Sequence, residues 1–155
     1  MEAIPILTID DVNAIDQVLS DFLQKSESQL AVVIDKGGNI ISQQGDLNVM
    51  DVTIVAALAA GSFAATKELA RRIGEMEFNA LYHQGAGMHI FMNSVDENTI
   101  MVTVFNDQTT VGLVRFYTAN ASAQLEQVLN RLREKSANET FTLTKEDIAN
   151  AGNLF

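Results

Sequence analysis

The sequence predicts a three-layer α/β domain, in which three helices cover both faces of one five-stranded antiparallel sheet. Two observations predict it. Segments with helical spacing of apolar residues alternate with short β-branched and aromatic runs, in the order α-β-β-α-β-β-β-α. Some of these runs, such as residues 100–105, are apolar on both faces, so the sheet must be covered on both sides. We therefore expect two helices on one face and one on the other.

The first elements have clear boundary signals. Thr8 is a good N-cap for a first helix, with acidic residues in the first turn that follows it. Two strands follow, and Gly37 and Gly38 are expected to supply positive φ for the turn between them. The second helix is expected to begin after Asp51 and to stop at Gly74.

Three further strands and a third helix follow. The strand runs cover residues 77–84, 87–95 and 98–105, and the breaks between them are short enough for direct hairpins. The run at 77–84 is expected to lie at an edge of the sheet, where an unprotected apolar strand invites pairing with another chain. Thr109 or Thr110 is expected to cap the third helix.

Residues 136–155 differ from the rest of the chain in composition and in helix signals. They begin polar, carry one good helix cap at Thr144 and end in an apolar tip. A helix this short is not stable in isolation. We therefore expect residues 1–135 to form the domain, and residues 136–155 to form a tail that is partly disordered or folds on a partner. The tail residues expected to contact that partner are Ile148, Leu154 and Phe155.

The second helix has two apolar faces instead of one. On a helical wheel one face is bulky, and we expect it to pack on the sheet. It consists of Ile54, Leu58, Ala65, Leu69 and Ile73. The other face is built of small residues where a solvated helix carries charges, so we expect it to contact a second copy or a different protein. The expected contact residues are Ala56, Ala57, Ala60, Gly61, Phe63, Ala64, Lys67 and Arg71. The alternative is that alanine is present only for its helix propensity.

Composition limits the classes of partner. The chain of 155 residues carries 20 acidic and 10 basic residues, a formal net charge of −10, which disfavours nucleic acid and anionic membrane surfaces. No apolar run reaches the ~18 residues of a membrane span, and the first residues lack the basic region of a secretory signal. We therefore expect a cytoplasmic protein that does not insert into membranes.

No pattern for catalysis is present. Without Cys there is no thiolate nucleophile or Cys-based metal site, and no Walker A motif occurs. His83 and His89 are expected to face each other across a hairpin, where two imidazoles could share a metal or form a pH-sensitive pair. Cross-strand packing is the simpler expectation. We expect no cofactor, no metal and no catalytic residue.

Three segments together resemble a known family. They are LAVVIDKGGNIIS at 30–42, AALAAGSFAATKELARRIGEMEFNALYHQG at 56–85, and IMVTVFNDQTTVGLVRFYT at 100–118. Over about residues 5–135 the chain is similar to the roadblock/LC7 family, and within it to the bacterial MglB branch. The resemblance implies a roadblock/LC7-type fold and a homodimer that pairs its second helices and its third strands. In that branch the dimer binds the Ras-like GTPase MglA and accelerates its GTP hydrolysis, in cell polarity or motility.

Arg71 and Arg72 could act as an arginine finger on such a GTPase. They are also the cations that a helix dipole favours at its C-terminal end, and we prefer this second interpretation. The resemblance implies an activator that reorganises the switch loops of the GTPase and adds no catalytic group. A dimeric scaffold that leaves GTP turnover unchanged, and a small-ligand sensor, remain open alternatives.

Overall fold

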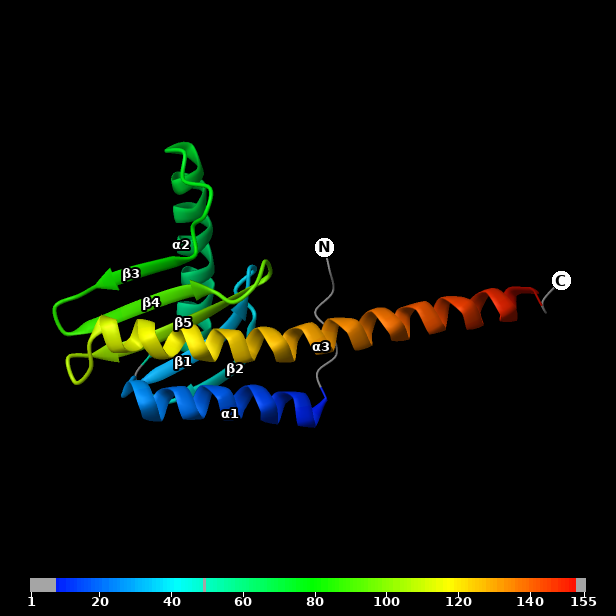
Figure 1. Ribbon diagram of the computed structural model, residues 1–155, viewed down its shortest axis with the longest axis horizontal. Helices are drawn as coiled ribbons and strands as arrows, with labels where there is room; N and C mark the ends of the chain where they lie inside the picture. Colours follow the sequence, from blue (N-terminus) through cyan, green and yellow to red (C-terminus); the bar gives the residue numbers. More distant parts are fainter. Residues whose placement is uncertain (1–7, 49, 153–155) are drawn as a thin grey trace.

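The computed structural model describes residues 8–48 and 50–152, with side chains described up to Lys135. Its elements follow the expected order (Figure 1). They are α1 (Ile9–Ser26), β1 (Leu30–Asp35), β2 (Ile40–Gly45), α2 (Val52–Arg72), β3 (Ala80–Gln84), β4 (Met88–Ser94), β5 (Thr99–Asn106) and α3 (Val111–Gly152).

The five strands form one antiparallel sheet in the order β2-β1-β5-β4-β3. β1 and β5 lie inside the sheet and are buried along nearly their whole length. β3 is an edge strand, as the sequence predicted, and within the described sheet it pairs with β4 alone. The other edge is β2.

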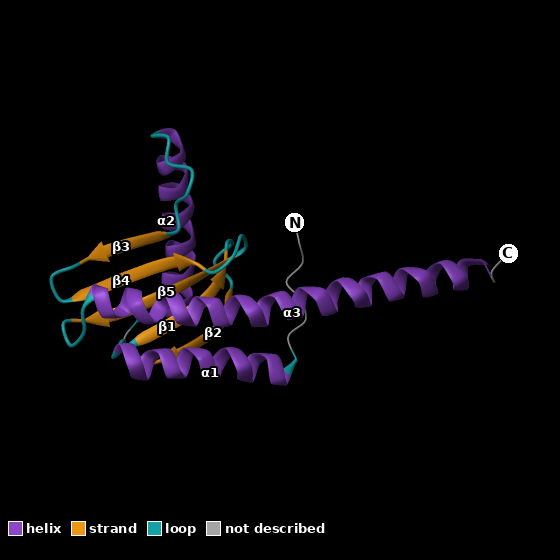
Figure 2. Cartoon of the chain, viewed as in Figure 1, coloured by secondary structure: helices purple, strands orange, loops and turns teal. Residues whose placement is uncertain are grey.

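Two helices cover one face of the sheet and one covers the other (Figure 2), which confirms the predicted layers. α1 and α3 pack together over the core that contains Phe22, Phe91 and Phe105. α2 packs on the opposite face, where Phe63 and Val102 belong to a second core. Both faces of the sheet are therefore buried within the protomer.

The predicted N-caps of the three helices and the predicted end of α2 are confirmed. Thr8 and Asp11 form a reciprocal capping box at the start of α1. Asp51 accepts a hydrogen bond from the Ile54 N–H at 3.3 Å, and the Thr110 hydroxyl accepts one from the Leu113 N–H at 3.3 Å. Gly74, with φ of +87°, follows the last turn of α2.

One turn holds α2 close to the sheet. Of the two glycines predicted to have positive φ, only Gly38 does so, at +88°. A Cβ atom built on Gly38 would lie 2.8 Å from the Ala57 Cα. The turn between β1 and β2 therefore touches the backbone of α2, and a residue without a side chain is required there.

The third helix is longer than predicted. α3 continues without a break past Lys135 to Gly152, so Thr144 lies inside this helix and is not an N-cap. Residues 111–132 are already helical and packed on the core, and extending a formed helix avoids the cost of a new nucleus. The outer part of α3 projects away from the rest of the domain (Figure 1). The predicted contacts of the tail lie outside the described side chains.

Truncation after Lys135 should leave the melting temperature almost unchanged. All the α3 residues whose described side chains belong to the core, from Val114 to Leu132, remain in the shortened chain. Differential scanning calorimetry of the truncated and complete chains tests this expectation. A fall of more than about 3 °C, equivalent to about 1 kcal/mol for a chain of this size, would show that the projecting segment stabilises the fold.

Candidate protein-interaction site

α2 crosses one face of the sheet and continues beyond β3, so that its last turns stand clear of the strands (Figure 1). The face of α2 that packs on the sheet is the small one. Val52, Ala56, Ala59, Ala60 and Phe63 are buried there, and Ala70 is buried further along the helix. Small side chains let the helix backbone approach the sheet closely, while larger residues of the strands fill the space between them.

The predicted orientation of α2 was therefore wrong. Ile54, Leu58, Leu69 and Ile73 were expected to face the sheet, yet their exposed fractions are 56%, 66%, 61% and 77%. Conversely, three of the predicted contact residues belong to the protomer's own core. These are Ala56, Ala60 and Phe63, with exposed fractions of 2%, 4% and 4%. The protein does have a second apolar face on α2, but that face is the bulky one.

Two exposed sets of residues result. We call Ile54, Leu58, Ala65 and Leu69 the outer stripe, since they recur at helical spacing on the side of α2 away from the sheet. We call Ala57, Gly61, Ala64, Lys67 and Arg71 the flank, since they are the predicted contact residues that remain exposed. A contiguous row of exposed large apolar side chains is typical of a surface that another protein covers.

α2 passes the length and composition criteria for a membrane-crossing helix. Its small face nevertheless packs on the sheet through Ala56, Ala59 and Phe63. It is a core helix of the domain.

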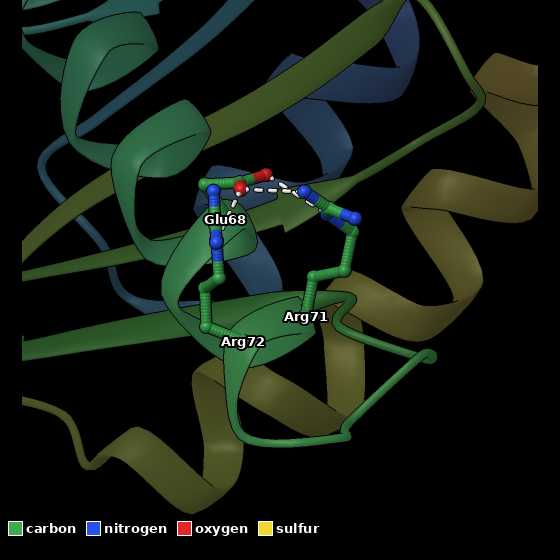
Figure 3. A network of polar contacts seen from close by, with 3 residues as sticks. All are labelled: Glu68, Arg71 and Arg72. Atoms are coloured by element: carbon green, nitrogen blue, oxygen red, sulfur yellow. Dashed lines mark hydrogen bonds and ion pairs between the residues drawn. The ribbon is translucent and has the colours of Figure 1, made fainter.

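The two arginines near the end of α2 are both held by Glu68 (Figure 3). Arg71 makes two hydrogen bonds to the Glu68 carboxylate, with Nε–Oε2 at 3.0 Å and Nη2–Oε1 at 2.7 Å. Arg72 Nε donates to Oε1 at 3.0 Å. The two guanidinium groups hold the pKa of Glu68 below its usual value, and Glu68 raises the pKa of Arg71. All three side chains are exposed, so this network contributes little to folding stability.

A groove of about 420 Å³ lies beside this end of α2. Its walls come from α2, from the segment that joins α2 to β3, and from the turns β1–β2 and β4–β5. The lining residues are Lys36, Ala60, Phe63, Ala64, Lys67, Glu68, Arg71, Glu75, Met76, Phe78, Ser94, Asp96 and Ile100. Five of the predicted contact residues are thus brought together here, namely Ala60, Phe63, Ala64, Lys67 and Arg71.

The groove has an apolar floor and an uneven distribution of charge at its rim. The rings of Phe63 and Phe78 lie 5.1 Å apart between their centroids. Asp96 is paired with Arg133 of α3, with Nη2–Oδ2 at 2.9 Å, and Glu68 is paired as described above. Among the described residues, no carboxylate lies within ion-pair distance of Lys36 or Lys67.

The two histidines do not form a pair. In the β3–β4 hairpin His83 lies opposite Ile90, and His89 lies opposite Gln84. The register differs by one residue from the expected one, which places the two imidazoles on opposite faces of the sheet. His89 is buried, with Nε2 2.8 Å from the Asp107 carboxylate and Nδ1 accepting from the Gly85 N–H at 3.2 Å. Its structural role is to join two loops.

No group of three potential metal ligands occurs in the described part of the chain.

Comparison with known proteins gives one family match. The model for the Roadblock/LC7 domain matches residues 14–105.

Solved structures with the same fold include three MglB proteins. Myxococcus xanthus MglB is 31% identical, with 82% of this chain and 96% of that chain covered and a TM-score of 0.76. The gliding protein MglB from Thermus thermophilus is 26% identical, with 84% and 99% covered and a TM-score of 0.77. An MglB with a tetrameric arrangement is 24% identical, with 85% and 99% covered and a TM-score of 0.79.

Proposed function

We propose that this protein is a cytoplasmic, homodimeric regulator of a Ras-like small GTPase of the MglA type. The chain belongs to the Roadblock/LC7 domain family, and it is similar to MglB proteins over most of its length. In this proposal the dimer binds the GTPase and stimulates its GTP hydrolysis. It binds the GTPase more tightly when the switch loops are aligned for catalysis than when they are in the resting conformation. The dimer itself contributes no catalytic residue.

The observation that carries the proposal is the outer stripe beside a free strand edge. The C-terminal end of α2, which carries Leu69 of the outer stripe, runs past the open edge of β3 (Figure 1). β3 contains neither Pro nor Lys, the residues that commonly protect an edge strand from pairing. A second copy would pair its β3 with this edge, which would bring its α2 beside this α2 on the same face of the continued sheet, in contact with one margin of the outer stripe.

The flank is the part of the predicted contact surface on which the GTPase would dock. Its small residues allow the partner's backbone to approach closely, and Lys67 and Arg71 supply charge at one end. At 100° per residue, Ala64, Lys67 and Arg71 lie about a quarter turn or more from the outer stripe, so dimerisation would leave these three residues accessible, whereas Gly61 lies next to the stripe. Each dimer would present two such surfaces.

The direct test is phosphate release by the Ras-like GTPase of the same organism, with and without this protein. We expect faster GTP turnover in its presence, with saturation as the complex forms. Binding without a change in turnover would support the alternative function, a dimeric scaffold. Absence of binding would contradict both.

Replacing Arg71 or Arg72 by Ala should lower affinity for the GTPase only modestly and leave the maximal stimulated rate intact. Each guanidinium is hydrogen-bonded to Glu68, so neither is oriented to stabilise the transition state of GTP hydrolysis. The comparison of stimulated rate at saturation with the dissociation constant separates the two effects. Loss of a true arginine finger would lower the saturated rate by about 10³-fold or more, and that outcome would contradict the mechanism.

A further inference from the structure

We propose that the groove beside α2 binds the C-terminal segment of a second copy of this chain. The groove is defined above by Phe63, Phe78 and Ile100 at its floor and by Lys36 and Lys67 at its rim. The segment is residues 146–155, of which Leu154 and Phe155 lie outside the described structure. The inference rests on the groove and on the segment, and not on the proposed GTPase partner.

The groove is suited to an apolar side chain that follows acidic residues. Phe63 and Ile100 are only 4% and 3% exposed, so the apolar surface that a ligand would contact comes mainly from the half-buried Phe78 and from Met76, which is 76% exposed. A volume of about 420 Å³ is within the range of pockets that hold small ligands. Lys36 and Lys67 are exposed and lack a carboxylate partner among the described residues. A carboxylate of the bound segment would form an ion pair with either lysine.

The C-terminal sequence has the complementary chemistry. Glu146 and Asp147 form an acidic pair, Ile148 follows them directly, and Leu154 and Phe155 are adjacent large apolar residues. In a chain with a net charge of −10, most surfaces repel such a segment. In the groove, two lysines without an ion pair and exposed apolar surface occur together, and one carboxylate without an ion pair among the described residues, that of Glu75, lies there as well.

The geometry of α3 favours binding in trans. Arg133 of α3 is ion-paired to Asp96, which itself lines the groove. From Arg133 the helix continues to Gly152, a further distance of about 28 Å at 1.5 Å per residue. The helix therefore carries residues 146–152 away from the groove of its own protomer (Figure 1). A second copy can deliver the segment with α3 unbroken.

The consequence for assembly is a contact distinct from the outer stripe. Lys67 and Phe63 lie more than a quarter turn around α2 from Leu58 and Leu69, at 100° per residue. Both contacts can therefore form at once. If the GTPase docks on the flank as proposed, a segment in the groove would cover Ala64, Lys67 and Arg71 and compete with it.

The test uses a fluorescent peptide of residues 141–155 and the full-length Leu154→Glu/Phe155→Glu variant as the receiving protein, so that its own segments do not compete. We expect saturable binding by fluorescence anisotropy. Lys67→Glu in the receiver should weaken binding at least about tenfold, the effect of losing one charge-assisted contact. Lys25→Glu is the matched control. Lys25 is exposed on α1, which covers the face of the sheet opposite to α2, so this receiver should bind the peptide as tightly as the receiver without the substitution.

Charge reversal provides the decisive comparison. A peptide with Glu146→Lys and Asp147→Lys should bind the Lys67→Glu receiver more tightly than the unmodified peptide does. Sedimentation velocity of the unmodified protein should show concentration-dependent association beyond the dimer, and the Leu154→Glu/Phe155→Glu variant should lose this additional association while remaining dimeric.

Absence of saturable peptide binding, or binding that Lys67→Glu leaves unchanged, overturns the inference. It does so whether or not the protein stimulates a GTPase. Conversely, peptide binding in a protein that never affects GTP turnover would support the inference and contradict the proposed function. Loss of GTPase binding in Lys67→Glu, with no peptide binding to any receiver, would assign the groove to the GTPase instead and overturn the inference.

Discussion

Replacing both Leu58 and Leu69 by Glu should convert the dimer into a folded monomer. The two side chains are 66% and 61% exposed in the protomer, so the fold itself loses no packing. In the proposed dimer they would be buried, and each pair of copies would then bring four carboxylates into a desolvated interface without partners. Such unpaired charges cost several kcal/mol, and about 1.4 kcal/mol is a factor of ten in the dissociation constant. We expect the constant to rise by about 100-fold or more.

Light scattering at micromolar concentration measures this directly, and circular dichroism verifies that the variant is folded. Leu113→Glu is a matched control, because Leu113 is 46% exposed but lies on α3 and not on the outer stripe. It should remain dimeric. A dimeric Leu58→Glu/Leu69→Glu protein would mean that the outer stripe is not the interface, and the paired-helix arrangement would have to be abandoned.

Arg should be tolerated at position 64 and not at position 56, although both residues are alanines of the same helix. Ala56 is 2% exposed and is packed in the core between α2 and the sheet. A guanidinium there overfills the core and loses its hydration. We expect the melting temperature of Ala56→Arg to fall by about 10 °C or more, on the scale of about 2–4 °C per kcal/mol for this chain length. Ala64 is exposed, and Ala64→Arg should keep its melting temperature while losing the response of the GTPase.

If the small face of α2 were exposed, as expected from the sequence, Ala56→Arg and Ala64→Arg would both leave the stability unchanged. Thermal unfolding of the pair therefore distinguishes the two orientations of α2. Equal stability would contradict the packing described here.

Element order, the edge position of β3 and the caps at Thr8, Asp51 and Thr110 could all be predicted, because each depends on local signals or on burial along a strand. The direction that α2 faces could not be predicted by hydrophobicity alone, since both faces are apolar. A signal was nevertheless present. Arg72 follows Ala65 by seven residues and so lies on the bulky stripe. A guanidinium in line with that stripe favours its exposure.

The remaining errors have different physical causes. The register of the β3–β4 hairpin depends on the geometry of the loop at residues 85–87, and a difference of one residue separated His83 from His89. The Asp107 partner of His89 comes from another loop, so no local pattern indicates it. The length of α3 was underestimated because residues 136–152 were judged in isolation, whereas they extend a helix that the core already stabilises.

The contact between Gly38 and α2 has a consequence for the outer surface of the molecule. Because backbone meets backbone there, no rotamer can adjust the separation between helix and sheet. The turn therefore fixes the distance between α2 and the sheet, and this distance determines how far the exposed side chains of α2 lie from the sheet. The shape that the protein offers to a neighbour is thus determined in part by a residue with no side chain, in a turn that touches the backbone of α2 at Ala57.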